Sequence, residues 1–132
     1  MKTSARTQVE RQRVRRQRAR RRGDIAEFLC RCHLRLRLWR IVARDWRCPA
    51  GEIDIIARRG KVLAVIEVKA RATAADAASA VSPRQRRRIV RATSAFLLAR
   101  PELAGLAVRF DVMLVEKMRP PRHLPGVWRA DE

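Results

Sequence analysis

The 132-residue chain lacks the long apolar segments that mark membrane proteins and exported proteins. No apolar run approaches the roughly 20 residues that a membrane-spanning helix needs. The N-terminus also lacks the apolar region of a secretory signal. Three cysteines are an odd number, which does not indicate a disulfide framework. We therefore expect a cytoplasmic protein that does not insert into a membrane.

The cysteines raise the question of a zinc site, because Cys30, Cys32 and His33 are close in sequence and Cys48 follows later. Residues two apart on a helix do not face each other, and the ligand spacing of known zinc sites is not met. Small buried cysteines are therefore the preferred interpretation.

Acidic residues are scarce, since 13 Asp and Glu stand against 32 Lys and Arg, for a formal net charge of +19. Residues 1–22 contribute ten basic residues and one acidic residue, or +9; residues 23–132 contribute 22 and 12, or +10. The part expected to fold is thus basic in its own right, which indicates a polyanionic partner, nucleic acid. Residues 1–22 are predicted to be a disordered basic arm, or a lone basic helix, that binds phosphates. A tail that only raises solubility, or a start site assigned too early, is the alternative, and an Arg-rich organellar transit peptide is a weaker third one.

Residues 51–71, GEIDIIARRGKVLAVIEVKAR, are predicted to form two strands. Side chains alternate between the two faces of a strand. Glu52 and Asp54 therefore share one face of the first strand, and Glu67 and Lys69 share one face of the second.

A two-residue turn at Arg59-Gly60 would give cross-strand partners whose numbers sum to about 119. Glu52 then lies opposite Glu67, which is diagonal to Asp54. Like charges directly opposite one another destabilise a sheet, so a divalent cation such as Mg²⁺ is expected among them. A hairpin with one solvated polar face is the plainer alternative, and the spacing alone leaves both open.

The other elements follow from hydrophobic periodicity and turn residues. We expect a helix over residues 23–38, a strand over 39–46, a loop with a helical turn over 72–80, a helix over 83–100, a strand over 108–115, and a loop with a short edge segment over 118–132. Ser82 and Pro83 are typical of a helix N-terminus. The order helix, three strands, helix, strand (αβββαβ) predicts an α/β sandwich with a mixed central sheet flanked by helices. The predicted units are the arm 1–22, one domain over 23–117 and an extension over 118–132.

Two further features concern charged residues outside the hairpin. The helix over 83–100 carries basic residues that we interpret as a clamp on phosphates, with a solvated basic face as the alternative: Arg84, Arg86, Arg87, Arg88 and Arg91. Asp111, on the last strand, is expected to pair with an arginine. No chemistry is assigned to His123.

The hairpin motifs resemble those of known families. Asp54, followed thirteen residues later by Glu67-Val68-Lys69, resembles the D…(D/E)-x-K core of the PD-(D/E)XK nuclease superfamily. GEIDIIAR…VIEVKAR is more similar still to the YraN family of uncharacterised bacterial proteins. The similarity spans about residues 23–117, including AE at 26–27, SPRQ at 82–85 and RFDV at 109–112.

The resemblance implies a restriction-endonuclease-like fold and a Mg²⁺- or Mn²⁺-dependent endonuclease that hydrolyses DNA. By this likeness Asp54, Glu67 and the Val68 carbonyl bind the metal, and Lys69 orients or helps to deprotonate the attacking water. Glu27 contacts the metal through water.

The resemblance supports two further residues less strongly. Glu52 has a supporting or structural role, and Gln85 takes the place of a helix glutamine found near the site in related nucleases. The tyrosine that accompanies that glutamine is absent, with Ile89 in its place. Leu38 stands where the family has a glycine before the aromatic residue at the helix exit, which leaves the helix end open.

Two other functions fit the charge. One is a DNA- or RNA-binding module of the same fold without catalysis; the other is a basic scaffold that contacts ribosomal RNA or another protein. Metal dependence discriminates the enzyme from both, and the sequence carries no signal for the oligomeric state.

Overall fold

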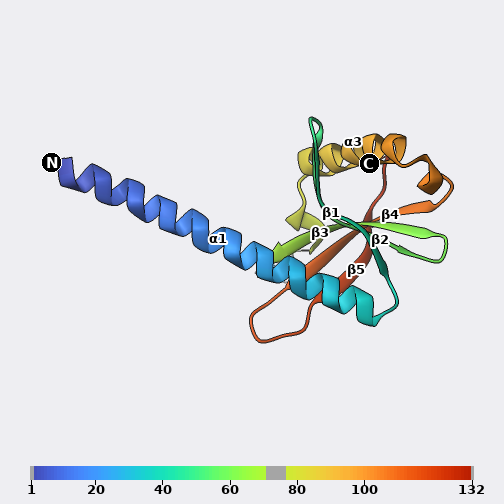
Figure 1. Cartoon of the computed structure of the whole chain (residues 1–132), viewed down its shortest axis with the longest axis horizontal. Helices are drawn as coiled ribbons and strands as arrows, with labels where there is room; N and C mark the ends of the chain where they lie inside the picture. The colour runs from blue at the N-terminus through green and yellow to red at the C-terminus, as the bar shows by residue number, and fades with distance from the viewer. Residues whose placement is uncertain (1, 71–76, 132) are drawn as a thin grey trace.

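A five-stranded mixed sheet between two helices organises the chain (Figure 1). The computed structural model describes residues 2–70 and 77–131. The helices are α1 (Lys2–Leu36), α2 (Ala77–Ala80), α3 (Pro83–Ala99) and the short 3₁₀ helix η2 (Pro101–Leu103). The strands are β1 (Arg40–Cys48), β2 (Gly51–Arg59), β3 (Val62–Ala70), β4 (Ala107–Val115) and β5 (Arg122–Trp128). This arrangement confirms the predicted α/β sandwich of the restriction-endonuclease-like type.

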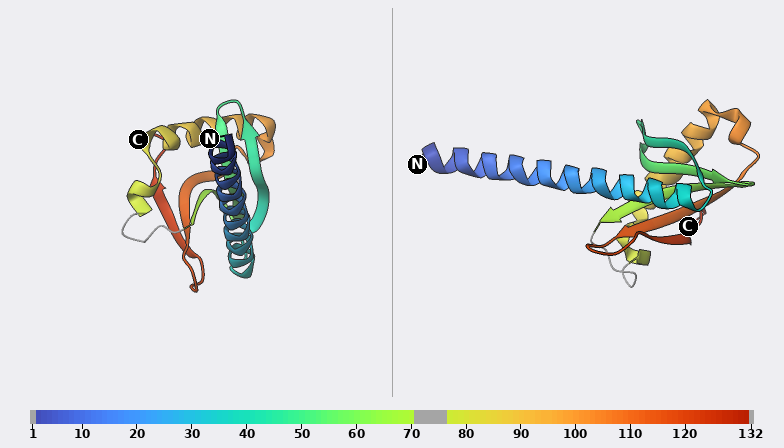
Figure 2. Two further views of the ribbon diagram at one scale, coloured as in Figure 1. Left: turned by 90° about the vertical axis from the view of Figure 1, so that its left-hand side faces the viewer. Right: turned by 60° about the horizontal axis from the view of Figure 1, so that its bottom comes forward.

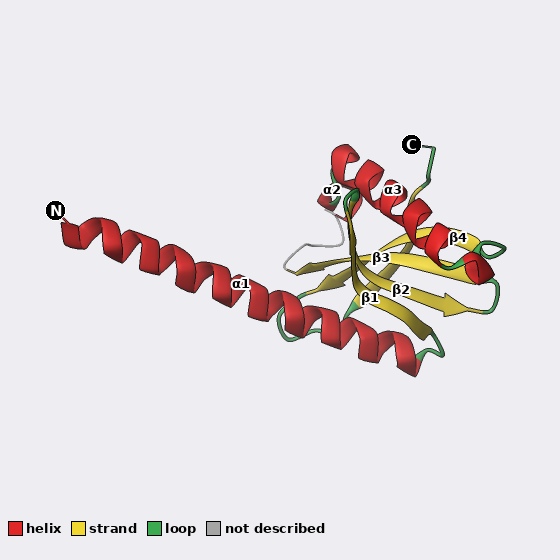
Figure 3. Cartoon of the chain, turned by 45° about the horizontal axis from the view of Figure 1, so that its top comes forward, coloured by secondary structure: helices red, strands yellow, loops and turns green. Residues whose placement is uncertain are grey.

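The sheet has the order β1-β2-β3-β4-β5, and its neighbours are antiparallel except for the parallel pair β3 and β4. Figure 3 shows the sheet with α1 on one side and α3 on the other. The central strand β3 is buried on both faces, because Leu63 and Val65 pack in the core beneath α3 while Ala64 and Ile66 pack beneath α1. Burial on both faces explains why this strand is a continuous apolar run.

The β2–β3 turn lies one residue later in the sequence than predicted, which shifts the cross-strand register by two residues. Ile55 pairs with Ile66 and Arg59 pairs with Val62, so partner numbers sum to 121 instead of 119. The turn therefore contains Gly60 and Lys61, and Gly60 has the positive φ of 60° that favours glycine at the first turn position. Glu52 consequently does not lie opposite Glu67, which corrects the expected pairing.

Helix α3 begins and ends where its sequence predicts. The Ser82 hydroxyl accepts a hydrogen bond from the Gln85 N–H at 3.1 Å, and Pro83 occupies the first turn. Ile89, Ala92 and Phe96 lie at helical spacing and are buried against the sheet. The helix stops before Pro101, which cannot continue the backbone hydrogen bonding.

Helix α1 is longer than the predicted helix over residues 23–38. It begins at Lys2, runs through Gly23, and projects away from the sheet as a straight arm (Figures 1 and 2). Of the two predicted states for residues 1–22, disordered or helical, the structure has the helix. The domain-facing part buries Ala26, Cys30 and Leu34, which are spaced by four residues. No helix in the described residues combines the length and apolarity required to span a bilayer.

The exit of α1 has the hydrogen bonds of a Schellman motif. The Trp39 N–H donates to the Leu34 carbonyl at 3.0 Å, and the Leu38 N–H donates to the Arg35 carbonyl at 3.1 Å. Leu38 therefore occupies the left-handed position, with a φ of 68°, where glycine is the usual residue. The chain completes this turn with an L-residue in a strained conformation.

The C-terminal segment contributes β5, an edge strand that closes over β4 through polar contacts. Asp111 on β4 is fully buried and accepts two hydrogen bonds of 2.9 Å from Arg109, which confirms the expected arginine pair. His123 Nε2 lies 2.6 Å from Asp111 Oδ2, and the Gly126 N–H donates to Asp111 Oδ1 at 2.9 Å. Burial alone would raise the pKa of Asp111, but these hydrogen bonds hold that pKa below its usual value. The network is structural and fixes β5.

Replacing Leu38 by glycine is expected to raise the free energy of unfolding by about 1 kcal/mol. A left-handed L-residue costs roughly 1–2 kcal/mol, and the greater entropy of glycine in the unfolded chain offsets part of that gain. Little burial is lost, because Leu38 is 85% exposed. Urea unfolding of the variant and the parent measures the difference.

The matched control is Leu36→Gly, since Leu36 is 82% exposed but lies in the right-handed last turn of α1. That change is expected to destabilise the protein by roughly 0.5–1 kcal/mol. Equal destabilisation by both substitutions would show that the left-handed conformation at residue 38 carries no cost.

Candidate metal centre

The site forms where β2 and β3 separate. Their pairing ends at Ile55 and Ile66. Asp54, which precedes Ile55 on β2, turns its carboxylate toward β3 instead of continuing the ladder of paired residues. Asp54 Oδ2 accepts a hydrogen bond of 2.9 Å from the Val68 N–H. This contact holds Asp54 beside Glu67, so the structure brings together the two central residues of the predicted motif.

Glu67 and Lys69 face α3, as strand alternation predicts. Glu67 is buried, and Lys69 Nζ lies 3.6 Å from Glu67 Oε1. Gln85, on the first turns of α3, joins the two: its Nε2 donates to Glu67 Oε1 at 2.9 Å, and its Oε1 accepts from Lys69 Nζ at 3.4 Å. The Ser82 cap fixes the start of α3 and thereby places Gln85 at the site.

Glu27 and Asp45 complete the cluster from the α1 side. One carboxylate oxygen from each of Glu27, Asp45 and Asp54 lies within 4.8 Å of the others, close enough to share a metal ion. Glu27 comes from α1 and Asp45 from β1, so three elements converge on Asp54. Glu27, predicted to contact the metal through water, is thus one of three side chains that could hold an ion together.

Asp45 was not predicted from the sequence, in which it is one acidic residue in an arginine-rich strand. The flanking pairs Arg44–Ile55 and Trp46–Ile53 place Asp45 opposite Asp54. A register shift between Ile41 and Ala43 sets this alignment, and Asp45 itself has a φ of 48°. Bulges and left-handed residues of this kind re-aim side chains at functional sites.

The carboxylates are poorly neutralised by the protein. Burial raises the pKa of Glu67 to about 8, and the charge of Asp54 adds to this effect while Lys69 opposes it. Burial also raises the pKa of Glu27 to about 8, with further contributions from Asp45 and Asp54. The pKa of Asp54 is raised by burial in spite of the Val68 N–H. A bound cation would relieve this repulsion.

The donor set suits a hard divalent cation. All side-chain ligands are carboxylate oxygens, which Mg²⁺, Mn²⁺ and Ca²⁺ prefer. The Val68 carbonyl, which the resemblance implies as a further ligand, belongs to the residue whose N–H donates to Asp54. The cluster of Glu27, Asp45 and Asp54 can therefore hold a metal ion, with Glu67 immediately beside it.

The weakly supported Glu52 lies outside this cluster. It is exposed and pairs with Arg47 at 3.3 Å across the β1–β2 hairpin. Together with Gln85 and Arg88, these two residues line a recess of about 380 Å³ between that hairpin and α3. Glu52 thus borders an approach to the site from the α3 side.

The five arginines predicted to bind phosphates divide into two groups. Four are exposed on α3, namely Arg84, Arg87, Arg88 and Arg91. Arg86 is half-buried: its Nε donates to the Val81 carbonyl at 2.9 Å, and its guanidinium lies 5.6 Å from the centre of the Trp128 ring. Tertiary packing therefore gives Arg86 a structural contact that the helical pattern alone did not reveal.

This fold, with acidic side chains and a lysine gathered at the open end of a central hairpin, defines a restriction-endonuclease-like α/β protein with a candidate metal site. The chain belongs to the UPF0102 family, because the model of "Uncharacterised protein family UPF0102" matches residues 26–115. This result confirms the resemblance to the YraN family. The matched region includes Glu27, Asp45, Asp54, Glu67 and Lys69, and it excludes the whole N-terminal arm of residues 1–22.

Relatives in the same family resemble the chain over most of its length. A UPF0102 protein of Paramagnetospirillum magneticum is 49% identical over 119 residues, covering 87% of this chain and 92% of that protein. A UPF0102 protein of Parvibaculum lavamentivorans is 50% identical over 107 residues, covering 81% and 80%. One of Bradyrhizobium diazoefficiens is 47% identical over 108 residues, covering 82% and 81%.

Substituting Glu67 by glutamine is expected to stabilise the metal-free protein as the pH rises. The folded-state pKa of about 8 exceeds the ordinary value of 4.5, so the native state binds more protons than the unfolded state between these values. Ionisation of Glu67 therefore lowers the free energy of unfolding as the pH rises from 4.5 to about 8. Glutamine keeps an acceptor for Gln85 and avoids the buried charge.

The test compares urea unfolding of the parent and Glu67→Gln from pH 5 to pH 8.5 with a chelator present. The advantage of the variant should grow with pH to on the order of 1 kcal/mol or more, the value of a one-unit pKa shift. Glu102→Gln, at an exposed residue paired with Arg100, is the control and should give no trend. A Glu67→Gln advantage that does not change with pH would contradict the charge argument.

Proposed function

We propose that this protein is a metal-dependent nuclease that hydrolyses DNA phosphodiester bonds with Mg²⁺ or Mn²⁺. The observation that carries the proposal is the convergence of Asp54, Glu67 and Lys69 where β2 leaves β3, with Glu27 and Asp45 completing a set of oxygen ligands. A purely structural hairpin would gain nothing from burying carboxylates together, since buried charge costs free energy.

In this proposal Asp54 lies at the centre of the metal site. Glu27 and Asp45 approach it from one side, and Glu67 and the Val68 carbonyl from the other. When bound, the metal would polarise the phosphate and acidify a water molecule. The protein's part is to fix the oxygens in place, which the Val68 N–H does for Asp54 and Gln85 does for Glu67.

Lys69 is the residue proposed to act on the reacting groups. Its Nζ is held between Glu67 Oε1 and Gln85 Oε1, at 3.6 and 3.4 Å, and its side chain remains partly exposed. From this position the ammonium can donate to a phosphate oxygen or orient the attacking water. Gln85 is a positioning residue, because it contacts both Glu67 and Lys69.

Exposed arginines supply the means of holding the DNA backbone. Arg84, Arg87, Arg88 and Arg91 lie on the same helix that carries Gln85, and Arg88 lines the recess beside it. Arginine suits phosphate because its planar guanidinium donates two parallel hydrogen bonds. A nucleic-acid-binding protein without catalysis would share these arginines, so the metal centre distinguishes the two functions.

Cleavage is expected to require both the metal and Lys69. Asp54→Asn and Lys69→Ala should each lower Mn²⁺-dependent cleavage by at least 100-fold, since a positioned catalytic group contributes roughly 10²–10⁴-fold. DNA binding should be retained in both variants. The assay uses labelled branched, nicked, single-stranded and duplex DNA, with Mn²⁺ or with a chelator.

Glu102→Gln is the control for the removal of a carboxylate, because Glu102 lies on η2 in an exposed ion pair. It should cleave like the parent protein. DNA binding with no cleavage of any substrate by the parent would favour the non-catalytic alternative.

DNA affinity is expected to depend on salt through the exposed arginines of α3. Removing two phosphate contacts in Arg84→Gln/Arg88→Gln should reduce the slope of log affinity against log salt by about 2, since each contact contributes roughly 0.9. Fluorescence anisotropy from 50 to 250 mM KCl gives the slope.

Arg35→Gln is the matched control, because Arg35 is equally exposed but lies in the last turn of α1. It should leave the slope unchanged. A double variant whose slope equals that of the parent would remove α3 from the proposed interface.

A further inference from the structure

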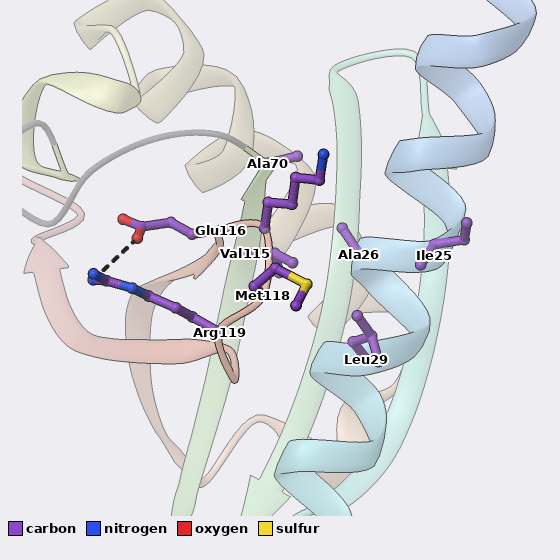
Figure 4. A pocket seen from close by; sticks show the side chains of 9 residues that line it. Ile25, Ala26, Leu29, Ala70, Val115, Glu116, Met118 and Arg119 are labelled. Carbon is purple, nitrogen blue, oxygen red and sulfur yellow. Dashed lines mark ion pairs between the residues drawn. The ribbon is translucent and has the colours of Figure 1, made fainter.

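An apolar groove lies beside the candidate metal centre, on the α1 side of the sheet. Its volume is about 580 Å³, within the range of sites for small organic ligands. Helix α1 forms one wall and the β4–β5 loop forms the other, over the ends of β3 and β4 (Figure 4). The lining residues of α1 are Ile25, Ala26 and Leu29; those of the strands and loop include Ala70, Val115 and Met118.

The walls of this groove expose apolar side chains to solvent. Ile25, Leu29 and Met118 are all exposed, Met118 to 94%. A cluster of exposed apolar side chains in a concave surface is typical of a binding site, whereas apolar side chains exposed singly are common and carry no such meaning. The rim is basic: Lys117 is exposed, and Arg119 pairs with Glu116 at 3.5 Å.

The groove adjoins the candidate metal centre along α1, because Ala26 in its lining directly precedes Glu27 of the acidic cluster. At the floor of the groove Ala70 directly follows Lys69 on β3, but the Lys69 side chain points to the α3 face. A ligand in the groove would therefore lie beside the Glu27 side of the metal centre.

We propose that the groove binds the base and sugar of an unpaired nucleotide next to the scissile phosphate. The inference rests on the proposed function and specifies its substrate class: DNA with an unpaired nucleotide, as in a flap, a branch or a single strand, in preference to continuous duplex. Bases in a duplex are stacked and present only their edges, whereas an unstacked base offers an apolar face to an apolar wall.

Charge distinguishes this occupant from a protein partner of the same sequence. A second copy would bring another net charge of +19 to a basic rim, and like charge opposes association. A nucleotide combines an apolar base face with an anionic phosphate, which matches the apolar walls and Lys117 together. Proteins that bind single strands combine a positively charged groove with aromatic side chains that contact base faces; in this groove aliphatic side chains occupy that place.

The experiment measures binding of two fluorescent DNA probes in a chelator, so that no cleavage occurs. The probes share one duplex sequence, and one carries a single unpaired nucleotide at the centre of one strand. The groove variants are Leu29→Gln and Met118→Asn. Met118 is almost fully exposed and has a φ of 67°, which asparagine tolerates, so its replacement leaves the fold intact. Leu98→Gln is the matched control, because Leu98 is 86% exposed on α3.

The parent is expected to prefer the probe with the unpaired nucleotide by on the order of tenfold, since burying roughly 55 Å² of a base against the apolar walls, at about 25 cal/mol per Å², corresponds to that factor. Both groove variants should lose most of this preference while keeping their affinity for plain duplex. The Leu98→Gln control should behave like the parent.

Four other results would overturn the inference. Equal affinity of the parent for both probes, or equal weakening of both by the groove variants, would exclude an unpaired nucleotide as the ligand of the groove. The proposed nuclease function on duplex DNA would remain. Groove variants that change sedimentation from an oligomer to a monomer would make the groove an interface between copies. A parent that binds neither probe and cleaves no DNA with Mn²⁺ would refute the nuclease function as well.

Discussion

The repulsion among carboxylates at the divergence of β2 and β3 is the constraint on which the rest of the site depends. Burying charge is costly unless it is paired and hydrogen-bonded. The fold supplies one ammonium from Lys69, one amide from Gln85 and one backbone N–H from Val68. These contacts leave the pKa of Glu67 raised to about 8, so compensation by the protein is incomplete. A sequence under selection for stability alone would replace such residues; their presence here indicates that the uncompensated charge has a use.

The faces of β3 could be predicted from the sequence, although the register of the hairpin could not, and the alternation of β2 is interrupted because Ile53 and Ile55 pack on opposite faces of the sheet. Strand alternation has a period of two, so an error of two residues in register kept Asp54 and Glu67 on neighbouring positions. An error of one residue in register would have exchanged the core and polar faces of β3. Asp45 was beyond reach, because its position depends on a register shift in β1 and on a positive φ. Neither feature has a local signature of the strength that glycine gives at Gly60.

Tertiary contacts also give different environments to residues that look alike in the sequence. The arginines of α3 form one basic series, yet Arg86 turns back to Val81 and Trp128 while its neighbours remain exposed. The helical spacing of Ile25, Phe28, Leu29, Cys32 and Leu36 predicted a helix in this segment but not its buried face. The structure buries Ala26, Cys30 and Leu34 instead, while Ile25, Phe28, Leu29 and Leu36 are exposed. The apolar spacing also gave no sign that the helix continues through the basic arm, because helix formation by charged residues is decided by propensity rather than by a buried face.

The charges of this molecule would affect a polyanion differently far from the site and close to it. Beyond the Debye length of about 8 Å at physiological salt, individual charges are screened and the excess of exposed arginines dominates the approach. Within the cluster the oxygens of Glu27, Asp45 and Asp54 lie within 4.8 Å of one another, and their repulsion is screened much less. A phosphate drawn in by the arginines would therefore meet local negative charge at the last step. In the proposed nuclease a divalent cation at Asp54 would reverse that local sign, so metal binding would be a condition for the approach of the phosphate as well as for its hydrolysis.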